Sequence, residues 1–188
     1  MAGQAVWHNG NFHAAYVGLA LDAVRAALFQ TAALSVARLG TLMEPAFTGL
    51  DAFLARDRAS SGVMILEYVA HSAVADIRRF AAPAALGGAV LSRGAEEHAG
   101  FATQSARATT DAVAAYRVVL ACELIAATRA LRMQGREPAA GGGLRNAYDL
   151  ADSALERATG DRPLDGDLAA AQRVLADLTA LAHWPAAR

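Results

Sequence analysis

Apolar residues dominate three long stretches of the chain without keeping to a single stripe. Residues 13–44 are rich in Ala and Leu and end before the helix-stopping Pro45, so they predict one long helix, or two in line. Residues 62–81, which follow candidate serine caps, and residues 102–134, which precede a glycine, predict two more. Apolar side chains cover most of the circumference of the first helix. A helix of that kind must be buried on nearly every side.

The last quarter of the chain has a different pattern. Residues 135–143 (GREPAAGGG) predict a linker, because proline and three consecutive glycines do not continue a helix. Residues 146–158 and 167–181 place their apolar positions at helical spacing and predict two amphipathic helices. No stretch alternates as a strand would, so the predicted fold class is all-α. Its parts are a bundle of long apolar helices with loops at residues 1–134, the linker at 135–143, and a small helical pair at 144–188.

The predicted helices are too long for a chain of this size to cover. A helix of about 30 residues extends about 45 Å. A compact protein of 188 residues has a radius of gyration of only about 16 Å. Three apolar rods of that length would leave more apolar surface exposed than a monomer tolerates. We therefore expect an obligate oligomer in which other subunits cover them.

Composition excludes several classes of protein. The 17 basic residues are all Arg and the formal net charge is −1, so no basic surface is available for a nucleic acid. A single cysteine, Cys122, excludes an internal disulfide and a cysteine-rich zinc site. The N-terminus lacks the basic start of a secretory signal. Charged residues interrupt the later apolar runs before the length that a bilayer requires. These features predict a cytoplasmic protein without a membrane segment.

Two segments carry candidate chemistry, and the first is His8-Asn9-Gly10-Asn11-Phe12-His13. It places two amides, two imidazoles and an aromatic ring at the start of the first long helix. Because a helix N-terminus favours negative charge, a substrate carboxylate or an oxyanion is a candidate ligand there. The alternative is structural: Asn11 caps the helix and Phe12 packs in the core.

The second segment is Ser92-Arg93-Gly94-Ala95-Glu96-Glu97-His98, in the loop of residues 86–101. Adjacent carboxylates followed by a histidine form a candidate general base, because mutual repulsion and burial raise the pKa of a carboxyl group. The alternative is a charged helix start that faces the helix dipole. The remaining candidates are weaker: Cys122 is expected to be a buried inert thiol, His71 a structural histidine, and Gly141–Gly143 an improbable phosphate loop.

Taken in order, these segments resemble the C-terminal part of the histidine and aromatic amino acid ammonia-lyase family. The resemblance is carried by eight spaced matches over nearly the whole chain: Gly10-Asn11-Phe12-His13-Ala14, Ser35 and Arg38 upstream of Glu44-Pro45, Gly49-Leu50 with Phe53-Leu54, Ser61-Gly62 with Met64, Ala82-Pro83-Ala84, Glu96-Glu97-His98, Glu123-Leu124 and Arg162-Pro163-Leu164. Eight matches in order are far more specific than any one motif.

The resemblance implies roles for four residues. Glu96 would be the catalytic base or the partner of the substrate ring, since an acidic residue here resembles the histidine lyases and glutamine is typical of phenylalanine and tyrosine lyases. Phe12 would line an aromatic substrate pocket, with Asn11 and His13 as its walls. Ala95 stands where the family usually has a polar amide, so the amino acid that serves as substrate stays open.

The departures from the family pattern are as informative as the matches. The family's electrophilic cofactor, methylidene-imidazolone, forms from an internal Ala-Ser-Gly, and this sequence has only Ala59-Ser60-Ser61-Gly62. The N-terminal half of the family's fold is also absent. We therefore expect a small subunit of a heteromeric lyase or aminomutase, inactive alone, whose larger partner carries the cofactor. The start at Met1 favours a natural small subunit, although an excised fragment would begin in the same way. A catalytically inactive assembly or regulatory subunit is the alternative.

Overall fold

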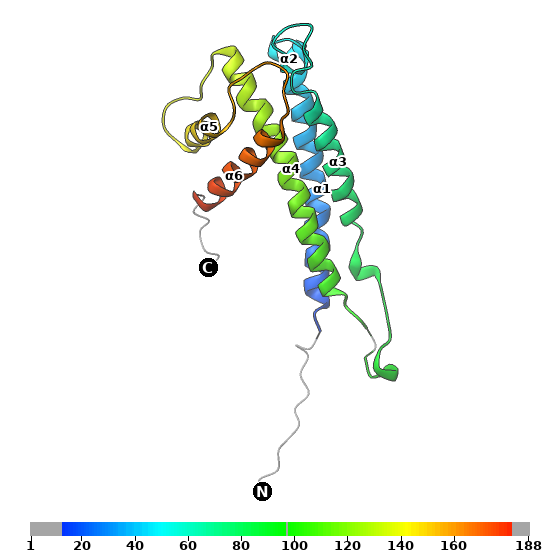
Figure 1. Cartoon of the computed structure of the whole chain (residues 1–188). Helices are drawn as coiled ribbons and strands as arrows, with labels where there is room; N and C mark the ends of the chain where they lie inside the picture. Colours follow the sequence, from blue (N-terminus) through cyan, green and yellow to red (C-terminus); the bar gives the residue numbers. More distant parts are fainter. Residues whose placement is uncertain (1–12, 97, 182–188) are drawn as a thin grey trace.

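The computed structural model describes residues 13–96 and 98–181. Three long helices run side by side as a bundle, and two shorter helices pack against one end of it (Figure 1). In the described part of the chain there is no strand, only an isolated bridge between Leu91 and Glu96, so the all-α prediction is confirmed. The helices are α1 (Ala15–Met43), α2 (Pro45–Thr48), α3 (Ile65–Phe80), α4 (Ala102–Gln134), α5 (Gly143–Ala154) and α6 (Asp165–Leu181), with single turns of 3₁₀ helix at Ala52–Leu54, Ala84–Leu86 and Ser92–Gly94.

The long helices follow the sequence prediction closely. The first is one continuous helix that ends two residues before Pro45. The helix α4 has the predicted bounds and ends at Gly135, whose positive φ of 61° lets its N–H bond back to the carbonyls of the last turn. The helix α3 begins at Ile65, later than predicted, because two turns of irregular backbone precede it.

The predicted bounds of α5 are wrong at both ends. The helix already begins at Gly143, within the predicted linker, and ends at Ala154 rather than at Ala158. The guanidinium group of Arg132, from α4, donates hydrogen bonds to the carbonyl oxygens of Asp152 and Leu155 at 2.7 and 3.1 Å. These are carbonyls that a continuing helix would use, so the tertiary contact ends the helix early.

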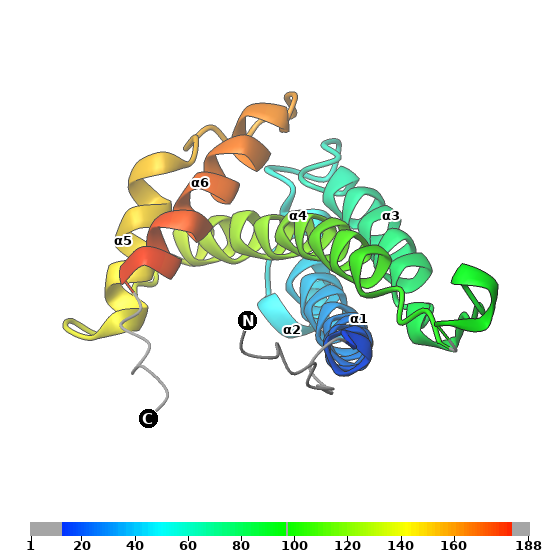
Figure 2. The same cartoon turned by 90° about the horizontal axis from the view of Figure 1, so that it is seen from below.

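The core lies where α4 packs against α1 and α3 on one side and against the C-terminal helices on the other (Figure 2). Buried apolar side chains from each element meet there: Leu39 of α1, Ile77 of α3, Val119, Ile125 and Ala126 of α4, Ala151 of α5, and Ala171 and Val174 of α6. The helix α4 therefore packs against both groups of helices, and its N-terminal end fixes one end of the loop that precedes it.

The helix α1 is only partly covered within this chain. It buries a single inward row of residues, although its sequence predicts burial on nearly every side. By length and composition alone it is long and apolar enough to cross a membrane, as are many core helices of soluble proteins, and it is alone in this among the described helices. Within residues 13–96 and 98–181, no element covers its outward face.

Candidate functional site

The start of α1 and the loop between α3 and α4 lie at the same end of the bundle (Figure 1). The residues of these two segments line a cleft. Its volume is about 450 Å³. The residues that line it come from two distant parts of the sequence: His13 and Ala14 from the start of α1, and Ala95, Glu96, His98, Ala99 and Gly100 from the loop. Two of the four candidate site residues, His13 and Glu96, therefore share one cleft. The other two, Asn11 and Phe12, lie outside the described residues, as does Glu97.

Glu96 is held by a tight and strained turn. The backbone N–H of Leu91 donates to the carbonyl of Glu96 at 2.9 Å, and the reverse bond is 3.3 Å long. Inside the turn, Ser92 and Arg93 have φ values of 51° and 57°, a region that costs free energy for any residue other than glycine. The hydroxyl of Ser92 donates to Oε1 of Glu96 at 3.1 Å. The half-buried carboxylate of Glu96 is thus oriented by its own loop.

This geometry overturns the structural alternative for Glu96. A charged helix start would place this residue in the first turn of α4. The helix begins six residues later, at Ala102, after Phe101 in the left-handed region. Local strain of this kind is often found at functional sites, and here it lies at Ser92 and Arg93, in the turn that holds Glu96.

Two imidazoles frame the mouth of the cleft. The rings of His13 and His98 lie 5.4 Å apart between centroids, with a tilt of 31° between their planes. Both side chains are exposed. His98 was part of the sequence motif, but its pairing with His13 depends on the approach of two segments 85 residues apart and has no local sequence signal.

Two glycines allow that approach. A Cβ atom on Gly18, in the first turns of α1, would lie 3.0 Å from the carbonyl oxygen of Gly100. A Cβ atom on Gly100 would lie 3.2 Å from both Cα and N of Ala15. Side-chain movement does not relieve contacts this short with backbone atoms, so a Cβ atom at either position would require the loop and α1 to move apart by a few tenths of an ångström.

A buried arginine fixes both ends of the loop. Arg25 of α1 has no solvent-exposed surface. Its Nε donates to the carbonyl of Phe80 at 2.6 Å and its Nη2 to that of Ala82 at 3.3 Å, where the chain leaves α3. Its Nη1 donates to the carbonyl and hydroxyl oxygens of Ser105, at 2.9 and 2.8 Å, where the chain enters α4.

Asp22 neutralises this arginine one turn earlier in α1. One carboxylate oxygen accepts hydrogen bonds from Arg25 and from the Ser105 hydroxyl, and the other accepts the backbone N–H of Ala85 at 2.9 Å. Burial raises the pKa of the Asp22 carboxyl, but the hydrogen bonds from Ala85, Ser105 and Arg25 together outweigh burial and hold the pKa below its usual value. Asp22, Arg25 and Ser105 form what we call the stem cluster.

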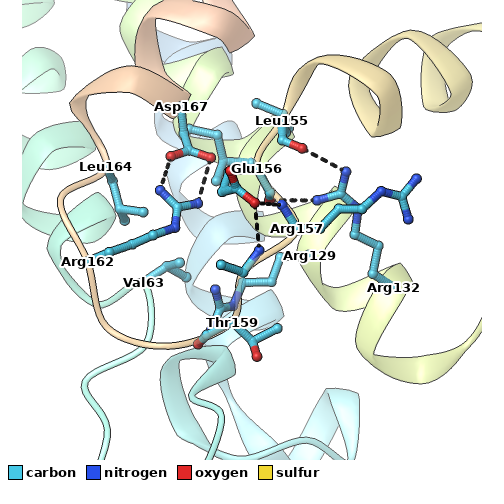
Figure 3. A pocket seen from close by; sticks show the side chains of 12 residues that line it. Val63, Arg129, Arg132, Leu155, Glu156, Arg157, Thr159, Arg162, Leu164 and Asp167 are labelled. Atoms are coloured by element: carbon cyan, nitrogen blue, oxygen red, sulfur yellow. Dashed lines mark hydrogen bonds and ion pairs between the residues drawn. The ribbon is translucent and has the colours of Figure 1, made fainter.

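A second, much smaller cavity lies where the C-terminal region joins α4 (Figure 3). Its volume is only about 20 Å³, room for a water molecule and not for a substrate. The guanidinium of Arg129 donates to the carbonyls of Leu54 and Thr159, at 2.9 and 2.5 Å, and Arg162 forms a bidentate ion pair with Asp167. The hydrogen bond from Arg129 fastens the segment around Thr159 to α4, and the ion pair between Arg162 and Asp167 joins it to the first turn of α6.

The segment that approximates the cofactor triplet lies at the opposite end of the bundle from the cleft, before α3 (Figure 1). The carboxylate of Asp161 accepts the backbone N–H groups of Ser61 and Gly62 at 2.8 and 2.9 Å. A Cβ atom on Gly62 would lie 2.4 Å from the carbonyl oxygen of Phe53. This segment is a packed turn and does not fit a methylidene-imidazolone.

Burial distinguishes Cys122 from His71, two of the weaker candidates. Cys122 is buried, and burial raises the pKa of its thiol to about 12, which confirms an unreactive thiol. His71, for which a structural role was expected, is exposed on α3. Among the described residues no group of three or more His, Cys, Asp or Glu side chains is placed to hold a metal ion.

The fold is that of the ammonia-lyases and aminomutases. Histidine ammonia-lyase from Trypanosoma cruzi superposes with a TM-score of 0.84 over 93% of this chain and 34% of its own, at 24% identity. Tyrosine aminomutase from Streptomyces globisporus superposes with a TM-score of 0.83 over 96% of this chain and 35% of its own, at 22% identity. Identities this low establish the fold only.

The sequence establishes the family. Residues 1–153 match the family described as aromatic amino acid lyase, so the chain belongs to that family. Among its relatives, the histidine ammonia-lyase of Symbiobacterium thermophilum is 36% identical over 162 residues, and that of Stigmatella aurantiaca is 36% identical over 168. The alignments cover 86% and 88% of this chain. The chain spans about a third of the length of these relatives, 32% in both.

Proposed function

We propose that this chain completes the active site of an ammonia-lyase for an aromatic, histidine-like amino acid, as the small subunit of a cytoplasmic hetero-oligomer. The observation that carries the proposal is the strained turn that holds Glu96 in a cleft beside His13. Family membership and the histidine ammonia-lyase relatives support the reaction class. In this proposal a larger subunit supplies the two thirds of the lyase that this chain does not contain.

The reaction requires a base for a proton at the β-carbon of the substrate. Glu96 is suited to that task, because Ser92 and the turn orient its carboxylate in the cleft. When the carboxylate takes the β-proton, ammonia leaves from the α-carbon and an α,β-unsaturated acid remains. A positioned general base contributes roughly 10²- to 10⁴-fold to the rate. His13, with Asn11 and Phe12 before it, would contact the substrate at the mouth of the cleft.

The cofactor would come from the partner. Methylidene-imidazolone, formed from an Ala-Ser-Gly in the larger subunit, would supply the electrophile that activates the amino group as a leaving group. This sequence contains no such triplet, and the turn at residues 59–62 does not fit the group. The proposal therefore predicts that this chain is inactive alone.

The test is reconstitution with a cofactor-bearing chain of the family. Release of the unsaturated acid from histidine and from other aromatic amino acids is followed by its ultraviolet absorbance, with and without this chain. Glu96→Gln is expected to reduce kcat by at least about 10²-fold. Glu137→Gln, an exposed glutamate in the linker, is the matched control and should leave turnover unchanged. Activity that depends on this chain but survives Glu96→Gln would make the chain an inactive assembly subunit.

A further inference from the structure

Arg129 of α4 is a buried cation that has no carboxylate partner among the described residues. Only 8% of its surface is exposed. Its Nε and Nη2 donate to the carbonyl oxygens of Leu54 and Thr159, and none of the ion pairs between described residues includes it. Buried charges in proteins are normally paired with an opposite charge. The buried Arg25, by contrast, is neutralised by Asp22.

The charges near Arg129 do not make up for the missing partner. Burial, and next the positive charge of Arg162, lower the pKa of the Arg129 guanidinium, and the charges of Asp161 and Asp167 raise this pKa by less. Both carboxylates are engaged elsewhere. Asp161 accepts two backbone N–H groups that precede α3, and Asp167 forms its bidentate ion pair with Arg162. The surroundings of Arg129 therefore favour an additional negative charge.

The cavity of about 20 Å³ between α4 and the C-terminal region lies beside this cation (Figure 3). Arg129 and Arg162 both line it. The Nε atom of Arg162 is buried and has no hydrogen-bond partner among the described residues, although the other two nitrogens of the group bind Asp167. Native structures pair the great majority of buried donors. A donor without an acceptor and a cation without a carboxylate thus belong to the wall of one cavity.

The acceptors of the same wall are already bound to arginine side chains. The carbonyl oxygens of Leu155 and Glu156 accept from Arg132 at 3.1 and 2.9 Å. The carbonyl oxygen of Thr159 accepts from Arg129. A buried water molecule typically makes about three hydrogen bonds and needs acceptors as well as donors, whereas an anion only accepts. The wall therefore suits an anion better than it suits a water molecule.

Charge and size define the class of this anion. The lining residues and their direct ion-pair partners carry four positive and three negative charges, from Arg129, Arg132, Arg157 and Arg162 and from Asp152, Glu156 and Asp167. One positive charge is in excess. A cavity of about 20 Å³ holds one species of about the size of water. Chloride is only slightly larger than water, whereas phosphate and other polyatomic anions do not fit.

We propose that this cavity binds one monatomic anion of the halide class, chloride in the cell, which accepts a hydrogen bond from Nε of Arg162 beside the Arg129 cation. The cavity lies next to Val63, at the opposite end of the bundle from the cleft (Figure 1), and the proposal does not rest on the proposed function. The anion would neutralise the cation that fastens the segment around Thr159 to α4. It would thereby stabilise the attachment of the C-terminal helices to the bundle.

The first experiment measures how the stability of the full chain depends on chloride. Urea unfolding is followed at one fixed protein concentration and at constant ionic strength, while sodium chloride replaces sodium gluconate. A ligand that binds only the folded state raises the ratio of folded to unfolded chain about tenfold for each tenfold rise in its concentration above Kd. We expect this response with chloride and with bromide. Equal stability in chloride and in gluconate would overturn the proposal.

Two variants test whether the response comes from this cavity. Arg162→Lys keeps the positive charge but removes the Nε donor, and it should raise the Kd for chloride at least about tenfold. Arg145→Lys is the matched control, because Arg145 is also paired with carboxylates and its side chain is 29% exposed against 23% for Arg162. Arg145 does not line the cavity, so this variant should respond as the unsubstituted chain does. An unchanged response in Arg162→Lys, or the same loss in both variants, would contradict the proposal.

A crystal of the unsubstituted chain grown in sodium bromide locates the ion directly and decides the question even if Arg162→Lys does not fold. The anomalous signal of bromide should peak in the cavity, within hydrogen-bond distance of Nε of Arg162. A peak without a chloride response in solution would mean an adventitious ion only and would overturn the proposal. An ordered water molecule in place of the peak would make this a water site and would also overturn it. None of these measurements uses turnover, so their failure leaves the proposed function standing.

Discussion

The stem cluster offers the sharpest test of how the fold holds the cleft. Arg25 is fully buried, and its carboxylate partner is Asp22. Arg25→Leu removes the buried cation, takes away the side-chain donor to the Phe80 carbonyl and one of the donors to the Ser105 carbonyl, and leaves Asp22 uncompensated. Breaking a buried pair by removing one partner costs about 3–5 kcal/mol. That is a large share of the roughly 5–15 kcal/mol by which domains are stable.

A double-mutant cycle separates the pair from the packing around it. Asp22→Leu alone should cost about as much as Arg25→Leu, because each leaves the other charge buried. Replacing both by leucine removes the two charges together, which is often neutral or stabilising. We expect the double variant to lose at least about 2 kcal/mol less than the sum of the single variants. Urea unfolding, followed by far-ultraviolet circular dichroism at one fixed protein concentration, measures the three free energies.

The same variants test the connection to the site. Because Arg25 holds the chain where it leaves α3 and where it enters α4, Arg25→Leu should raise amide hydrogen exchange in residues 86–101. Leu39→Ala, a cavity variant that costs about 2–5 kcal/mol in the core, is the control of similar destabilisation and should not act on that loop selectively. Any of three results would refute the reasoning. The free energies in the cycle could be additive, or Arg25→Leu could cost less than about 1 kcal/mol. Amide hydrogen exchange in residues 86–101 could also be equal in Arg25→Leu and Leu39→Ala.

Three further outcomes follow from the structure and the family resemblance. Gly100→Ala should push the loop away from α1, separate the two cleft walls and reduce turnover in the reconstituted complex, with little effect on its assembly as measured by light scattering. The pKa of Asp22 is held low in the folded chain because its hydrogen bonds outweigh burial, and the pKa of Asp152 is held low chiefly by the hydrogen bond from Arg132. The free energy by which these two carboxylates stabilise the fold is therefore complete above about pH 5 and is lost as the pH falls below about 4. Urea midpoints across pH 3–6 should show this fall, and Asp22→Asn should reduce it. Phe12→Ala should lower kcat/KM for the best aromatic substrate without dissolving the complex, since an aromatic pair contributes roughly 0.5–1.5 kcal/mol beyond the area it buries.

The helices could be predicted from the sequence because their signals are local. Alanine- and leucine-rich stretches, Pro45 and Gly135 fix where the long helices run and end, and the structure follows them within a few residues. The end of α5 could not be predicted in this way, because Arg132, 22 residues before Ala154, binds the carbonyls that would continue the helix. Tertiary contacts of this kind leave no periodic signal.

The candidate site was predictable only through motifs. The segment around Glu96 is visible in the sequence as adjacent acids before a histidine, and its resemblance to the family gives it a role. The strained turn, the Ser92 hydrogen bond and the approach of His98 to His13 emerge only in three dimensions. The stem cluster did leave a trace, since Asp22 and Arg25 are the two charges between His13 and Arg38 in an otherwise uncharged run and lie one turn apart.

Burial at the cleft bears on the proposal that a larger subunit completes the active site. Glu96 is half-buried and His13 and His98 are exposed, so water reaches the groups that would act on the substrate. Electrostatic stabilisation of a transition state is effective where water is excluded and the local dielectric is low. The described residues orient the carboxylate through the turn, the two glycines and the stem cluster, and they leave the cleft open to solvent. In the proposed function, the larger subunit would close the cleft, exclude that water and bring the cofactor to Glu96, so the site would become active only on assembly.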